Sequence, residues 1–228
     1  MRRFLKYFSK GEWILWISSL VLIVAFFCIF DRSNYLSLIA SLIGATSLIF
    51  NAKGNPLGQV LIIIFAILYG IISWTCAYYG EMITYLGMSL PMAVIALISW
   101  LRNPHNGNKA EVSVNRLNFK EVLFMLGLSA IVTVGFYFIL KHFNTANLIP
   151  STLSITTSFI AAYLTFRRSP FYAFAYALND LVLIVLWVMA TIDNISYISV
   201  IACFVIFLVN DLYGFFNWLK MEKRQKNS

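Results

Sequence analysis

Two Asn-Asp pairs lie inside long apolar segments near the C-terminal end of the sequence. Asn179 and Asp180 interrupt the apolar run at 170–190, and Asn210 and Asp211 interrupt the run at 195–219. A helix rises about 1.5 Å per residue, so Asp180 lies about 15 Å from the start of its run, near the middle of a bilayer. A carboxyl group at that depth is costly, and it faces a protein interior or a wet cavity rather than lipid. The pairs therefore predict a polar binding site inside a membrane protein.

Other polar and aromatic residues in the apolar segments add to the candidate residues of this binding site. Tyr176, Asp180 and Trp187 recur at helical spacing and share one face of their helix. Carboxylates and amides form hydrogen bonds with hydroxyl and carboxamide groups, and aromatic rings stack on a base. Carboxylates and aromatic rings also stabilise a cationic ring. The candidate binding residues are Gln59, Tyr69, Trp74, Tyr176, Asn179, Asp180, Trp187, Asn210, Asp211 and Tyr213. Two other interpretations stay open, a proton or ion relay and polar contacts that only hold helices together.

The composition indicates an all-α protein that crosses the membrane several times. Of its 228 residues, 61% are hydrophobic and 11% are charged, whereas a soluble domain carries about 25% charged residues. Eight segments are long and apolar enough to be spanning helices. They are 13–30, 35–50, 57–77, 82–101, 121–140, 148–166, 171–190 and 195–219.

Motifs of enzymes and metal sites are missing from the sequence. Cys28, Cys76 and Cys203 stand alone in apolar runs, so their spacing predicts neither a metal site nor a disulfide framework. His105 and His142 fall in loops without a nucleophile or a metal-ligand partner at motif spacing. Asp180 with Asp211 would be the only pair for an intramembrane aspartyl enzyme. We expect no enzyme activity, no cofactor and no metal.

The basic residues give the expected topology. With eight spans, the two termini and the loops at 51–56, 102–120 and 167–170 share one side, and this side holds 15 of the 17 basic residues. Only Arg32 and Lys141 lie on the other side. Basic loops stay in the cytoplasm, so both termini are predicted to be cytoplasmic. The net charge of +8 is thereby explained without a nucleic-acid partner.

Matched motifs suggest an internal repeat. Pro56 and Pro170 follow the second and sixth spans at an offset of 114 residues, and Trp100 and Trp218 end the fourth and eighth at an offset of 118. Because three helices invert the chain, a linker helix must return the second copy to the same side, which gives parallel repeats as in the SWEET transporters. The predicted organisation is an N-terminal helix (1–34), a three-helix repeat (35–101), a loop and linker helix (102–147), a second repeat (148–219) and a tail (220–228). The loop 102–120 is rich in Asn, Gly and Pro and is expected to be flexible.

Short motifs in this order resemble the PnuC family over roughly residues 35–225. They are Leu-Tyr-Gly-Ile at 68–71, Tyr-Tyr-Gly-Glu-Met at 78–82, Pro-Met at 91–92, Trp100 before a basic residue, and Asn-Asp-Leu-Tyr-Gly at 210–214 with Trp218. The resemblance implies a SWEET-like fold in the bacterial plasma membrane. It also implies uptake of nicotinamide riboside by facilitated diffusion, followed by trapping when a cytoplasmic kinase phosphorylates it.

The family resemblance also assigns expected roles to the candidate residues. It implies that Trp74 and Trp187 stack on the substrate and that Gln59, Asn179, Asp180, Asn210 and Asp211 make polar contacts. Tyr213 would support the cavity, and Trp100 or Trp218 would gate its cytoplasmic mouth. Thiamine, riboflavin or a deoxyribonucleoside as substrate, proton coupling, and a binding subunit of an energised importer remain alternatives. Assembly into a homo-oligomer, such as a trimer, also stays open.

Overall fold

The computed structural model describes residues 7–75, 79–145, 147–192 and 195–227. Among these residues, eight helices are long and apolar enough to cross a membrane, which confirms the predicted eight spans. Arg2, Arg3, Lys6, Cys76 and Tyr78 fall outside the described residues. The elements are α2 (Lys10–Phe30), α3 (Tyr35–Ala52), α4 (Leu57–Thr75), α5 (Tyr79–Ile83), the π-helix η1 (Thr84–Ser89), α6 (Leu90–Arg102), β1 (Pro104–His105), β2 (Asn108–Val112), α7 (Phe119–His142), α8 (Leu148–Phe166), α9 (Tyr172–Thr191), the 3₁₀ turn η2 (Ile195–Tyr197) and α10 (Ile198–Lys226).

Local capping chemistry explains why the first span starts earlier than its apolar run. The backbone N–H of Glu12 donates to Ser9 Oγ at 3.3 Å, and the Ser9 N–H donates to the Glu12 carboxylate at 2.6 Å. This capping box satisfies two backbone donors that the first turn would otherwise leave free. The helix therefore begins at Lys10 rather than at residue 13.

The fourth span is one continuous path from Tyr79 to Arg102 that widens in its middle. Residues Thr84–Ser89 form a π-helical turn directly before Pro91. Proline lacks a backbone N–H, and its ring clashes with the carbonyl four residues earlier, here that of Gly87. A π-turn at this point accommodates the proline without ending the helix.

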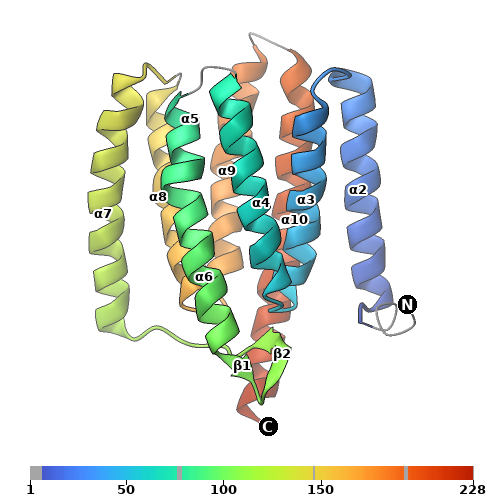
Figure 1. The fold of residues 1–228 in the computed structure, drawn as a ribbon, viewed down its shortest axis with the longest axis vertical. Coiled ribbons are helices and arrows are strands. Elements are labelled where there is room, and N and C mark those ends of the chain that lie inside the picture. The colour runs from blue at the N-terminus through green and yellow to red at the C-terminus, as the bar shows by residue number, and fades with distance from the viewer. Residues whose placement is uncertain (1–6, 76–78, 146, 193–194, 228) are drawn as a thin grey trace.

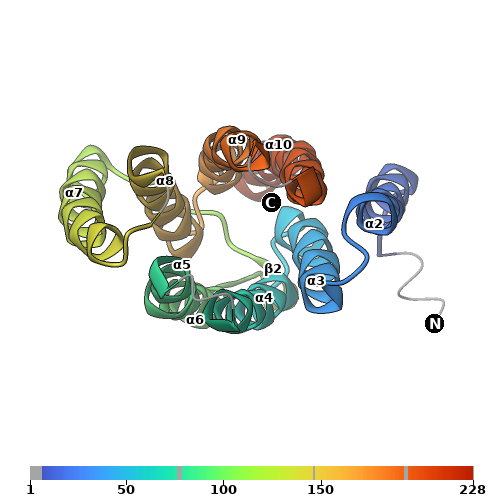
Figure 2. The ribbon, with the colours of Figure 1, turned by 90° about the horizontal axis from the view of Figure 1, so that it is seen from above.

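Six helices form a ring that encloses the interior, with two further helices outside it. Seen from above, α3, α4 and α5–α6 lie in one row and α8, α9 and α10 in a facing row (Figure 2). The rows meet where α3 packs on α10 and where α6 packs on α8. The helix α7 lies outside the ring against α8, and α2 lies outside it against α3 and α10. The start of α2 and the end of α10 lie at the same end of the bundle (Figure 1), which we call the basic end because it carries the basic loops.

Matched contacts at the basic end agree with the expected repeat. The indole N–H of Trp100 donates to the Thr165 carbonyl at 2.8 Å, and that of Trp218 donates to the Asn51 carbonyl at 2.8 Å. These two bonds join α6 to α8 and α10 to α3. The two donors, Trp100 and Trp218, are 118 residues apart, and the two acceptors, Asn51 and Thr165, are 114 residues apart. These are the same two offsets that the sequence motifs show.

The turns after α3 and α8 also correspond. Gly54 and Arg168, again 114 residues apart, both have left-handed backbone angles, with φ of 66° and 57°. The loop after α6 docks on both turns, because Val112 N–H donates to the Gly54 carbonyl and Asn115 N–H donates to the Arg168 carbonyl. One segment thus ties the two rows of helices together at the basic end.

The loop expected to be flexible contains an ordered β-hairpin, and this expectation was wrong. Strands β1 and β2 pair antiparallel around Asn106 and Gly107, which have φ of 45° and 75°. Asn-Gly is the preferred pair for a two-residue hairpin turn, because both positions need positive φ. The hairpin is then held on α10 through Gln225, whose side chain accepts from Val114 N–H and donates to the Val112 carbonyl.

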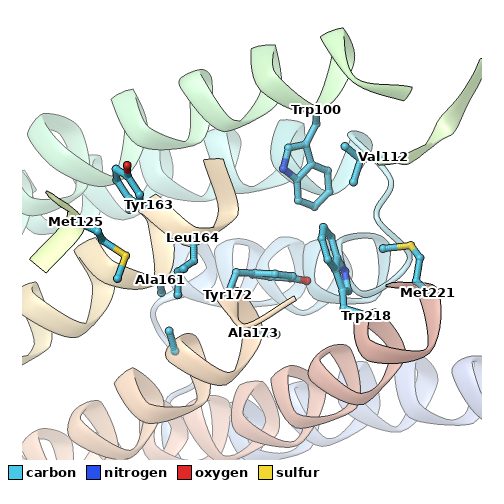
Figure 3. Close-up of a cluster of buried hydrophobic side chains, with 11 residues drawn as sticks. Trp100, Val112, Met125, Ala161, Tyr163, Leu164, Tyr172, Ala173, Trp218 and Met221 are labelled. Carbon is cyan, nitrogen blue, oxygen red and sulfur yellow. The ribbon is translucent and has the colours of Figure 1, made fainter. Parts of the chain in front are cut away.

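A cluster of buried side chains closes the interior at the basic end (Figure 3). Trp100 and Trp218 are completely buried, with ring centroids 5.4 Å apart. Tyr172 packs against Trp218, with ring centroids 4.8 Å apart, and Val112 of the hairpin and Met221 of α10 belong to the same cluster. We call Trp100, Trp218 and Tyr172 the tryptophan plug.

Candidate functional site

An inner cavity of about 140 Å³ lies within the ring of six helices, on the inner side of the tryptophan plug. All six helices of the ring contribute to its wall. Its polar lining comes mainly from Asn51, Gln59, Glu81, Tyr85, Ser158, Tyr172, Tyr176, Asn179, Asp180 and Asp211. Polar side chains from both rows of helices therefore border one cavity inside the ring.

Asp180 of α9 and Asp211 of α10 meet at the wall of this cavity. Both side chains are buried, with 4% and 5% exposure, and both line the cavity. Two ionised carboxylates in the same buried wall would repel each other, and a proton on one of them would remove that repulsion. Asp180 Oδ2 is buried without a hydrogen-bond partner among the described residues, so it is an acceptor available to a donor group of a ligand.

Asn179 is oriented by two hydroxyl groups of α8. Its side-chain oxygen accepts from Thr157 Oγ1 at 2.8 Å and from Ser158 Oγ at 3.0 Å. Because the oxygen is occupied, the amide nitrogen is left as a donor toward the cavity that Asn179 lines. The helix α9 thus presents a neighbouring donor and acceptor at positions 179 and 180.

Gln59 is positioned on the opposite row of helices. Its amide nitrogen donates to Asn51 Oδ1 at 2.8 Å, which links the start of α4 to the end of α3. Gln59 is buried, with 2% exposure, and its side chain lines the cavity together with Asn51. The pair gives the cavity an amide-lined wall that faces the acidic and amide groups of α9 and α10.

Five of the ten predicted binding residues meet in the inner cavity, namely Gln59, Tyr176, Asn179, Asp180 and Asp211. Two others, Tyr69 and Trp187, line a separate outer cavity toward the other end of the bundle. Trp187 belongs to the same face of α9 as Tyr176 and Asp180, as its spacing predicts, but it lies farther along the helix.

The remaining three predicted residues face other parts of the molecule. Trp74 is 61% exposed near the end of α4 and packs on Tyr79. Asn210 faces α2, where its amide donates to Ser19 Oγ at 2.9 Å. Tyr213 also faces α2 and donates to the Glu12 carboxylate at 2.9 Å. The two expected gates, Trp100 and Trp218, form the tryptophan plug at the basic end.

Glu81, Asn51 and Tyr172 line the cavity but were not among the predicted residues. Glu81 follows Gly80 at the start of the fourth span. From the sequence alone, a carboxylate at this position is interpreted as a helix-end residue at the membrane surface. Asn51 lies in the last turn of α3, and its sequence signal was its position near the Lys-Gly-Asn-Pro turn. Within the described residues, no group of three or more His, Cys, Asp or Glu side chains is arranged to hold a metal ion.

A ring of spanning helices around a central cavity with polar side chains in its wall, closed at one end by packed aromatic side chains, is an architecture of membrane transporters. A family model described as "Nicotinamide mononucleotide transporter" matches residues 34–220. The chain belongs to this family of transporters, which is the PnuC family that its motifs resemble, and the family consists of transporters rather than enzymes.

Curated relatives and a solved structure agree with this assignment. The chain is 24% identical to a nicotinamide riboside transporter PnuC of Neisseria mucosa over 214 residues, covering 92% of this chain and 81% of the relative. It is 22% identical to a nicotinamide riboside transporter PnuC of Haemophilus influenzae over 212 residues, covering 92% and 91%. A crystal structure of the vitamin B3 transporter PnuC has the same fold, with a TM-score of 0.81 at 23% identity over 96% of this chain and 94% of that chain.

Proposed function

We propose that this chain carries nicotinamide riboside across the membrane by facilitated diffusion, with the inner cavity as its central binding site. The observation that supports this most is the polar wall of the inner cavity, in which Asn179 and the Asp180–Asp211 pair lie next to Tyr172 and Tyr176. The substrate is suggested by the names of the two relatives. Phosphorylation of the riboside in the cytoplasm would then prevent its return.

The side chains of the cavity suit the chemistry of this substrate. The Asn179 amide nitrogen would donate to a ribose hydroxyl or to the carboxamide oxygen, and Asp180 Oδ2 would accept from a hydroxyl. The pyridinium ring carries a positive charge, which a nearby carboxylate and the faces of Tyr172 and Tyr176 would stabilise. Gln59 would complete the polar contacts from the other row of helices.

Transport requires that the cavity open alternately to each end of the bundle. In the proposed cycle the predicted repeats, 35–101 and 148–219, rock against each other, with Pro56, Pro91 and Pro170 as hinges. Opening toward the basic end would separate Trp100 from Trp218. The tryptophan plug is therefore the proposed gate on that side.

The proposed location is the bacterial plasma membrane, with the basic end and both termini in the cytoplasm. This orientation is tested with single cysteines in a cysteine-free variant. A membrane-impermeant thiol reagent added to intact cells should label Ser33→Cys and should leave Lys109→Cys unlabelled until the cells are opened; the reverse pattern would contradict this orientation.

The exposed apolar faces of α2 and α7 would be covered by lipid or by further copies of the chain, including a trimer. Native mass spectrometry of the purified protein distinguishes these cases.

The central test is calorimetric binding to the purified protein, followed by uptake into liposomes. We expect saturable binding of nicotinamide riboside and none of glucose, and about tenfold weaker binding for Asp180→Asn, which removes one charge-assisted contact. Unchanged affinity in Asp180→Asn would remove this residue from the site. Binding of thiamine, riboflavin or a deoxyribonucleoside instead would change the substrate, and tight binding without uptake would indicate a subunit of an energised importer.

The buried carboxyl pair favours one second candidate, proton-coupled uptake, because Asp180 and Asp211 line the same cavity and would be able to carry a proton along the transport path. Liposomes that contain a pH-sensitive dye and no kinase distinguish the two mechanisms. Coupled uptake would acidify the lumen and accumulate the riboside above its outside concentration. Uniport would equalise the two concentrations without a pH change.

A further inference from the structure

A second cavity, of about 300 Å³, lies between the inner cavity and the end of the bundle away from the termini. We call it the outer cavity. Residues of α2, α3, α4, α5, α9 and α10 line it, so it is built from both rows of helices and from the N-terminal helix. Neither the central site nor the tryptophan plug includes it.

The charges and rings of the outer cavity favour one kind of ligand. Its described lining residues include two carboxylates, Asp31 and Glu81, and no lysine, arginine or histidine. Trp187 and Tyr197 face it as a ring pair, with centroids 5.0 Å apart. Carboxylates together with aromatic faces, without a competing base, recognise an organic cation with a flat ring.

Two polar side chains in the outer cavity have no partner within the described part of the chain. Ser73 is buried, with 6% exposure, lines the cavity and makes no side-chain hydrogen bond to a described residue. Glu81 likewise makes no ion pair and no side-chain hydrogen bond to a described residue, although it is partly buried. Both side chains are therefore available to bond a ligand that enters the outer cavity.

A thin aromatic layer separates the outer cavity from the inner one. Glu81, Tyr85 and Phe204 line both cavities, so they stand at the boundary. The Tyr85 ring packs on Tyr69 at 5.2 Å, and Tyr69 packs on Phe65 at 4.6 Å. Tyr85 belongs to the π-helical turn Thr84–Ser89, a local widening that is common at functional sites.

We propose that the outer cavity is a loading site, in which Glu81 and Asp31 hold an aromatic cation before Tyr85 moves aside and admits it to the inner cavity. The proposal rests on the proposed function, because it takes the pyridinium of nicotinamide riboside as that cation. Glu81 is the central residue, since its carboxylate faces both cavities and can accompany the charge from one to the other. Asp31, which is held by Ser33 and Asn34 at the outer rim, attracts the cation to the entrance.

The experiment compares two substrates that differ in ring charge. Nicotinamide riboside has a cationic ring, and its reduced dihydropyridine form has a neutral ring with the same ribose and carboxamide. Initial uptake rates into liposomes are measured for both with the wild-type protein, Glu81→Gln, Asp31→Asn and the control Glu111→Gln. The control removes a carboxylate of the hairpin at the basic end, and thermal unfolding of each purified variant verifies its fold.

We expect Glu81→Gln to lower kcat/KM for the cation about tenfold, and Asp31→Asn about threefold, because each removes an attraction for positive charge. Uptake of the neutral form should stay within about twofold in both variants, and Glu111→Gln should change neither substrate. Equal losses for the two substrates, or no loss for either, would overturn the loading site. If Glu81→Gln fails to fold, Asp31→Asn alone decides. Absence of riboside uptake by the wild-type protein would instead contradict the proposed function.

Discussion

Gly58 shows how a single missing side chain shapes the inner cavity. A Cβ atom at this position would lie 2.2 Å from Asn51 Oδ1 and 2.7 Å from the Asn51 backbone nitrogen. Neither distance is compatible with a real carbon atom, so only glycine lets α4 start this close to the end of α3. The close approach is what allows Gln59 to bond Asn51 and form the amide-lined wall.

Gly58→Ala should therefore destabilise the protein by about 1–3 kcal/mol, because backbone as well as side chain must move. It should also weaken riboside binding, since Asn51 and Gln59 would be displaced. The matched control is Gly127→Ala on the outside of α7, where an added Cβ meets no atom within 4 Å. Thermal unfolding and calorimetry on both variants check the prediction, and equal stability of the two would contradict it.

At the scale of elements, α2 bridges the two rows of helices although it lies outside their ring. The Glu12 carboxylate is buried, with 4% exposure, and accepts from Lys53 Nζ at 3.0 Å and from Tyr213 OH at 2.9 Å. Lys53 follows α3, and Tyr213 belongs to α10, so one carboxylate holds the junction between the two predicted repeats.

Glu12→Ala should lower the free energy of unfolding by about 1–3 kcal/mol, because it leaves Lys53 and Tyr213 without their shared acceptor. Glu12→Gln should cost less, since its amide oxygen still accepts one of the two bonds. Thermal unfolding in one detergent measures both. Stability unchanged in Glu12→Ala would show that α2 is held by its apolar contacts alone.

On the scale of the whole molecule, the cavities follow one another along the bundle axis. The outer cavity adjoins the aromatic layer of Tyr85 and Phe204, the inner cavity follows it, and the tryptophan plug closes the basic end. The plug is formed by the ends of α6 and α10 and the start of α9, and the indole groups of Trp100 and Trp218 bond equivalent carbonyls across the two junctions of the ring. A motion that parts the two rows must break both bonds.

Trp100→Phe and Trp218→Phe should each lose one buried hydrogen bond, at a cost of about 1 kcal/mol. Because the two bonds are equivalent, we expect the variants to be destabilised to a similar extent. The two rings are in contact, so the double variant should depart from the sum of the single effects. Phe216→Leu, on the exposed face of α10, serves as the control in thermal unfolding; a large difference between Trp100→Phe and Trp218→Phe would argue against equivalent roles.

The sequence alone determined the number of spans, because an apolar run long enough to cross a bilayer is a local property of the chain. It also predicted that Asp180 and Asp211 face an interior, because the cost of a carboxyl group in lipid leaves few other locations. The hairpin was equally local and could have been predicted from Asn106-Gly107, a turn signal that the overall composition of the loop obscured.

Only the tertiary structure decided which polar residues share a cavity. Spacing along a helix places Tyr176, Asp180 and Trp187 on one face. It does not predict that Tyr176 and Asp180 line the inner cavity while Trp187 lines the outer one. Nor does it say that the face of α10 with Asn210 and Tyr213 turns toward α2, while neighbouring Asp211 turns inward. These directions depend on how helices distant in sequence rotate and pack against one another, and that packing brings Glu81, Asn51 and Tyr172 to the same cavity.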